Sequence, residues 1–202
     1  MYDSHPYMMA LKDHRHELEA RGITCIRGLI PLAAVKAARN MIYEIAQNHG
    51  LHTTGGWQRS ETRFGVDKSF RAEINALNRS SSFPNLISES LIDVTTNLVG
   101  EPVTKMPPGS QILFSLPILA SWSVPHDVWH VDVPRMGASG LPGLQVFTFL
   151  ETVRPRGGGT LVVAGSHRLG NTSGVTRSKD LKRRLGRERY FRWLFDPRRK
   201  PI

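Results

Sequence analysis

Residues 129–132 read Trp-His-Val-Asp, and the fold of the chain can be predicted by working outward from this stretch. On a β-strand, alternate side chains point to the same face, so His130 and Asp132 would direct an imidazole and a carboxylate into one space. These groups are two of the three ligands of a 2-His-1-carboxylate Fe(II) site. Because a His-x-Asp tripeptide often occurs by chance, its meaning depends on the sequence around it.

The sequence around this motif predicts an antiparallel β-structure. Strand-like apolar segments, separated by Pro- and Gly-rich loops, are expected at 111–116, 122–133, 144–150 and 160–164. Gly165-Ser166-His167 follows the last of them. Strands that come after helices, without regular βαβ alternation, argue against a doubly wound parallel sheet.

The N-terminal half is predicted to be mainly helical. Apolar residues recur at intervals of three and four, which is typical of amphipathic helices, over 7–20, 31–48 and 84–99. Gly22 and Gly100 are expected to end the first and the third helix, and Pro31 to begin the second. Residues 23–26 read as a short strand, and residues 51–82 as a loop-rich segment with one short helix.

The order of these features resembles the phytanoyl-CoA dioxygenase family: His-x-Asp, loop, apolar strand, Glu151, glycine loop, short strand, Gly-Ser-His. The resemblance covers Leu18 to Leu169 and includes Gly-Leu-Ile-Pro at 28–31. It implies an α+β fold, a double-stranded β-helix (jelly-roll, cupin-like) with N-terminal helices packed on the barrel. One domain over 1–202 is expected. Its parts are a mainly helical region at 1–105, barrel strands at 111–167 and a basic helical segment at 171–202.

The same resemblance implies an Fe(II)- and 2-oxoglutarate-dependent dioxygenase. Such an enzyme uses O₂ to hydroxylate a small organic substrate, here of unknown identity, and releases succinate and CO₂. His130 and Asp132 are the expected catalytic metal ligands, and Gln111 and Gln145 are the candidate contacts to 2-oxoglutarate. His126 is expected near the mouth of the site. Trp129 is expected to pack on the opposite face of the strand.

The sequence departs from the family at its distal ligands. The family has a second iron-binding His and a 2-oxoglutarate-binding Arg well downstream of Gly-Ser-His, whereas the last histidine here is His167. We expect His167 to bond a turn and not a metal. The chain is therefore expected to be a truncated oxygenase that lacks its final strands and turns over 2-oxoglutarate poorly or not at all.

Composition bounds the remaining possibilities. The only cysteine is Cys25, which excludes an intramolecular disulfide. A signal peptide and a membrane span are not expected, so a cytoplasmic location is predicted. His49 and His52 are interpreted as solvated loop residues.

Charge is concentrated at the C-terminal end. Residues 1–167 contain 15 Lys and Arg and 14 Asp and Glu, whereas residues 168–202 contain 12 and 3. We interpret the basic part, helical over 178–195, as an insertion of the resembled family; nucleic-acid and membrane partners are not expected, and the oligomeric state is open. Three alternatives stay open: an inactive oxygenase-fold protein or binding module, a cupin-type barrel with other ligands, and a nucleic-acid-binding protein with a basic tail.

Overall fold

The computed structural model describes most of the chain, in two compact units. The described residues are 6–61, 66–100, 102, 111–119, 121–126, 128–130, 144–154, 159–169, 182–183, 185–186, 189–196 and 198. The first unit comprises Met1–Arg15, Cys25–Ala120 and Gln145–Thr160. The second unit comprises His16–Thr24, Ser121–Leu144 and Leu161–Ile202.

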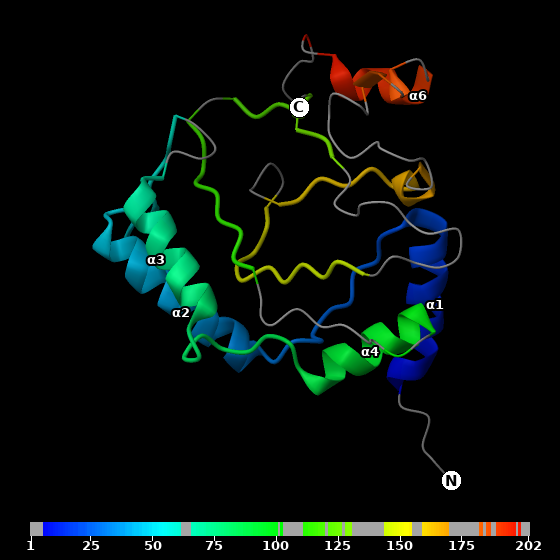
Figure 1. Ribbon diagram of the computed structural model, residues 1–202, viewed down its shortest axis with the longest axis horizontal. Coiled ribbons are helices and arrows are strands. Elements are labelled where there is room, and N and C mark those ends of the chain that lie inside the picture. Colours follow the sequence, from blue (N-terminus) through cyan, green and yellow to red (C-terminus); the bar gives the residue numbers. More distant parts are fainter. Residues whose placement is uncertain are drawn as a thin grey trace. The chain divides into compact units, whose positions relative to one another are not determined.

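The first unit is built mainly from helices (Figure 1). It contains α2 (Leu32–Asn48), a hairpin of β1 (His52–Thr53) and β2 (Gly56–Trp57), α3 (Lys68–Arg79) and α4 (Glu89–Val99). β1 and β2 are antiparallel, with His52 opposite Trp57. The helix α1 (Pro6–Arg21) has residues in both units. The structure therefore confirms that the segments predicted as helices, 7–20, 31–48 and 84–99, are helical, with somewhat different bounds.

Local signals explain where α3 and α4 begin. The Asp67 side chain accepts a hydrogen bond from the backbone N–H of Phe70 at 2.7 Å, and the Ser88 hydroxyl accepts one from Leu91 at 3.2 Å. Each satisfies an N–H that has no partner within the helix. Because Ser88 is the cap, α4 begins five residues later than the predicted start at residue 84. Gly100 ends it with φ +81°, as predicted.

The hydrophobic core of the first unit lies between α2 and α3. Its buried residues are Ile42, Ala46, Phe70, Ile74 and Leu77. The members from α2 are four residues apart, and those from α3 are spaced by four and three, so each helix presents one apolar face. Extended segments complete the cluster: Ile112, Phe114 and Leu150 pack against it.

The predicted double-stranded β-helix is wrong. Within the described residues the sheet has two strands, β1 and β2, and does not close into a barrel. The described parts of 111–116, 122–133, 144–150 and 160–164, and residues 23–26, have no strand assignment, and Figure 1 draws them without arrows. A single parallel bridge among the described residues, Ser60 with Ile118, lies just outside these segments.

The physical reason is that, among their described residues, these segments form no hydrogen-bonded ladders with one another. Alternating apolar residues indicate which face of an extended segment is suited to burial, but a strand also needs a partner for its backbone groups. Many of the apolar side chains in these segments are exposed, including Leu113 at 67% and Phe149 at 51%. The described residues of these segments do not bury a second apolar layer of the kind that holds a barrel together.

The second unit has a small core of its own. Leu185 and Phe195 are buried, and Trp129, Val163 and Phe191 pack against them. In the described part of this unit, the regular elements include η1 (Ser166–Leu169), α6 (Arg189–Arg192) and η2 (Trp193–Phe195). Helix was predicted over 178–195, and its described residues are largely helical, with Leu185 buried as expected. Leu181 and the side chain of Leu194, also predicted to face the body, lie outside the described part.

None of the helices in the described residues is long and apolar enough to cross a lipid bilayer.

Candidate functional site

His130 lies in an extended segment of the second unit whose exposure alternates. Val128 and His130 are exposed, whereas Trp129 between them is half-buried. The Nδ1 atom of His130 lies 2.9 Å from the backbone oxygen of Val128. A carbonyl oxygen only accepts hydrogen bonds, so Nδ1 is the protonated nitrogen, and in the neutral ring the lone pair is on Nε2. This is the tautomer of a histidine that binds a metal through Nε2.

Trp129 anchors this segment, as the sequence predicts. Its indole packs against the Leu185 and Phe195 cluster, and its Nε1–H donates to the backbone oxygen of Pro125 at 2.8 Å. Burying an indole with its N–H satisfied fixes the backbone on either side of it. The imidazole of His130 is therefore directed to the solvent face by the packing of its neighbour.

His167 bonds a helix end. Its Nε2 lies 3.1 Å from the backbone oxygen of Glu19, near the C-terminus of α1. Gly22 follows that helix with φ +74°, and a Cβ atom there would clash with Nδ1 of His167. Gly165 N–H also donates to the oxygen of Arg21 at 2.7 Å. The Gly-Ser-His turn thus closes on the end of α1, and the hydrogen bond of His167 goes to the backbone of a helix end, where the sequence predicted a bond to a turn.

The other predicted site residues belong to different units or lie outside the described part of the chain. Asp132 lies outside the described residues. Gln111 and Gln145 are exposed and belong to the first unit, whereas His130 belongs to the second. His126 is exposed in the second unit. Within the described part of the chain, no three His, Cys, Asp or Glu side chains form a group that could hold a metal ion.

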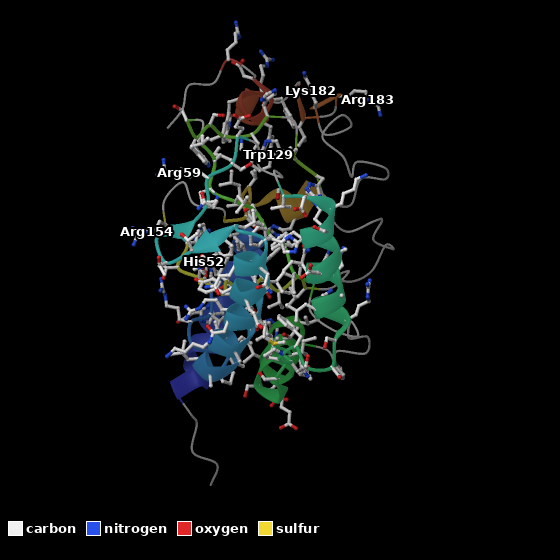
Figure 2. All side chains as sticks on the ribbon, turned by 90° about the vertical axis from the view of Figure 1, so that its left-hand side faces the viewer. His52, Arg59, Trp129, Arg154, Lys182 and Arg183 are labelled. Atoms are coloured by element: carbon white, nitrogen blue, oxygen red, sulfur yellow. The ribbon has the colours of Figure 1, made fainter. Side chains whose placement is uncertain are left out.

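The first unit contains a polar cluster that the sequence did not predict. Glu151 accepts hydrogen bonds from the Tyr43 hydroxyl and, at 3.0 Å and 3.2 Å, from Nε1–H of Trp57. His52 stacks on the Tyr43 ring, with centroids 4.3 Å apart and an angle of 21° between planes. His52, labelled in Figure 2, has a buried Nδ1 without a hydrogen-bond partner among the described residues. We call this group, with Arg39 over the Tyr43 ring at 5.6 Å, the Glu151 cluster.

The Glu151 cluster should be visible in a tyrosine titration. Burial, and then the hydrogen bond to Glu151, raise the pKa of Tyr43 to about 12 from 10.0. Because the folded-state pKa is above the unfolded value, this contribution to stability is complete below pH 10.0 and is lost as pH rises through about 12. We expect the ultraviolet absorbance of the four tyrosines to show one late ionisation, absent from Tyr43→Phe.

The matched variants for this titration are Glu151→Gln and Glu44→Gln. The first removes the carboxylate charge beside Tyr43 and should lower its pKa, while burial keeps the pKa above the ordinary value. The second removes an exposed charge from the same helix and should leave the late ionisation in place. An unchanged pKa in Glu151→Gln would contradict the geometry of the cluster.

His49 is paired, in contrast to the prediction of a solvated loop residue. Its Nε2 lies 2.8 Å from Glu73 and its Nδ1 3.7 Å from Asp67, so it links the end of α2 to α3. The hydrogen bond to Glu73 raises the pKa of His49, and the N–H of Phe70 lowers that of Asp67. This arrangement stabilises the helix pair and has no feature of a ligand site.

Comparison with known proteins does not identify a family for this chain. No family model, curated protein or solved structure matches the chain. The resemblance to the phytanoyl-CoA dioxygenases therefore rests on the quoted residues and their order, and it stays a prediction.

Proposed function

We propose that the chain carries the His-x-Asp part of an Fe(II)/2-oxoglutarate-dependent dioxygenase of the phytanoyl-CoA dioxygenase type. His130 and Asp132 supply an imidazole and a carboxylate to the metal. The order of motifs from Leu18 to Leu169 is the basis in sequence. The substrate is a small organic molecule whose identity follows from neither the motif nor the fold.

The observation that carries this proposal is the hydrogen bond of His130. Its Nδ1–H donates to the oxygen of Val128, so Nε2 has the lone pair that a divalent metal requires. A backbone acceptor at this nitrogen fixes the tautomer and helps to orient the ring. The imidazole of His130 thus has the tautomer that a metal ligand binding through Nε2 requires.

In this proposal the residues of the chain hold the metal and orient its ligands. The metal, when bound, supplies the oxidative chemistry that couples 2-oxoglutarate and O₂ to hydroxylation. His130 and Asp132 fix its position, and Trp129 fixes the segment that carries His130 by packing into the second core. Because a facial triad has three ligands and two are assigned, metal binding is expected to be weak and turnover slow.

Succinate formation tests this function. The purified chain is incubated with Fe(II), ascorbate, 2-oxoglutarate and O₂, and succinate is measured over time. We expect slow succinate formation that depends on added Fe(II) and falls to background in His130→Ala. His126→Ala, which removes an exposed histidine four residues away, should retain the rate of the unaltered chain.

Two results would count against the proposal. Equal succinate formation by the chain and by His130→Ala would remove His130 from the site. Loss in His126→Ala as large as in His130→Ala would show that the assay reports adventitious metal on surface histidines.

A further inference from the structure

The C-terminal segment of the chain contributes the buried residues around which the second unit packs. These residues are Leu185 and Phe195, and the side chains packed against them are Trp129, Val163 and Phe191. The sequence predicted this segment as a basic insertion, outside the metal site. Its apolar residues instead bury Trp129, the direct neighbour of the predicted metal ligand His130.

Hydrogen bonds within the C-terminal segment hold its two buried side chains together. The backbone N–H of Gly186 donates to the oxygen of Lys182 at 2.8 Å and closes the turn that carries Leu185. The side chain of Arg192 donates from Nε to the oxygen of Gly186 at 3.3 Å, which joins α6 to this turn. η2 follows α6 directly and contains Phe195. Leu185 and Phe195 therefore form one apolar surface, although ten residues separate them along the chain.

Trp129, labelled in Figure 2, connects this surface to His130. Its indole packs against the surface on one side, and its Nε1–H donates to the oxygen of Pro125 at 2.8 Å. Val128 and His130 flank it, and they contribute the two atoms of the 2.9 Å contact between the Val128 oxygen and Nδ1 of His130. The geometry of that contact depends on how the backbone on either side of Trp129 is held.

We propose that Leu185 and Phe195 are positioning residues for His130. They hold the indole of Trp129, and the indole holds the backbone whose carbonyl group fixes the imidazole. Truncation of a buried side chain leaves a cavity, and a large neighbour such as an indole shifts into it. Binding groups need to be held within about 0.5 Å by the residues that support them. That the positioned imidazole binds a metal rests on the proposed function.

The experiment reads the tautomer of His130 by nitrogen-15 NMR of the metal-free full chain with labelled histidine, at about pH 8.5, above the ordinary pKa of imidazole. The signal absent from His130→Ala belongs to His130, and we expect its proton on Nδ1. Leu185→Ala should shift His130 toward the tautomer mixture of an unrestrained imidazole. His167 is the internal reference for folding of the same unit, because its Nε2 lies 3.1 Å from the backbone oxygen of Glu19 and carries the proton. Its signal should not change.

Matched variants separate positioning from a general loss of stability. Leu161→Ala makes the same substitution in the same unit at a side chain that is 45% exposed, and it should leave His130 unchanged. Leu185→Met keeps the volume of the buried side chain and should restore the Nδ1–H tautomer. If loss of the His167 signal shows that Leu185→Ala has unfolded the unit, Phe195→Leu gives the same comparison with a smaller truncation.

An unchanged tautomer of His130 in both Leu185→Ala and Phe195→Leu would overturn the proposal, and so would an equal shift in Leu161→Ala. Dialysis of Fe(II) separates this inference from the proposed function. We expect Leu185→Ala to weaken Fe(II) binding about tenfold, as loss of an outer support of a metal ligand does. A tautomer shift in a chain that binds no Fe(II) would support the positioning of His130 and contradict the metal site. Equal Fe(II) affinity of the chain and Leu185→Ala would support the metal site and overturn the positioning.

Discussion

Phe70→Ala is expected to lower the free energy of unfolding by about 3–5 kcal/mol, the usual range for a buried phenylalanine. Phe70 is 1% exposed and is the largest fully buried side chain among the described residues. Its ring packs against Phe114 at a centroid distance of 4.8 Å and meets the edge of His49 at 5.5 Å. Truncation leaves a cavity between α2, α3 and an extended segment, where several elements would have to move to fill it.

Urea unfolding followed by far-ultraviolet circular dichroism measures this effect. The matched control is Phe149→Ala, which removes the same side chain from a position that is 51% exposed. It should change stability by no more than about 0.5 kcal/mol. If the two variants lost similar amounts of stability, the core of the first unit would lie elsewhere.

The sequence was informative where structure depends on neighbours along the chain. Gly22, Pro31 and Gly100 act within one turn of a helix end, so α1, α2 and α4 could be predicted from local signals. One short helix was predicted within 51–82 without bounds, and α3 is that helix; Asp67 as cap and apolar residues at 70, 74 and 77 mark where it lies. The glycines and the polar run on either side obscured that pattern.

The sequence was misleading where structure depends on distant partners. Residues 144–150 are mostly apolar and include one Val and two Phe, which favour strands, but a strand also requires a second segment that forms hydrogen bonds with it. The family resemblance supplied that partner by analogy, and the described residues do not form it. The sequence of one segment indicates whether it favours an extended conformation, but it does not show which other segment would form hydrogen bonds with it.

The candidate sites also differ in whether their contacts join residues that are close or distant along the chain. The Nδ1 contact of His130 spans two residues, so a hydrogen bond that orients the imidazole could be expected from the chemistry of metal ligands. The bond from Tyr43 to Glu151 spans 108 residues, and no local motif connects them.

His130→Ala is expected to weaken binding of Fe(II) by more than about 100-fold. Loss of an outer hydrogen-bond partner of a metal ligand costs about 10–100-fold in affinity, and removal of the ligand itself should cost more. The change is not expected to unfold the second unit, because His130 is exposed and the core contact is made by Trp129. Asp132→Ala should have an effect of similar size, since it removes the only anionic ligand assigned.

Equilibrium dialysis of Fe(II) against the full chain without oxygen tests this claim most directly, with His130→Ala, Asp132→Ala and His126→Ala in parallel. The proposal predicts one metal ion per chain, loss of that binding in the first two variants, and unchanged affinity in His126→Ala. Binding that survives in His130→Ala, or that fails equally in His126→Ala, would contradict a metal site at the Trp-His-Val-Asp motif.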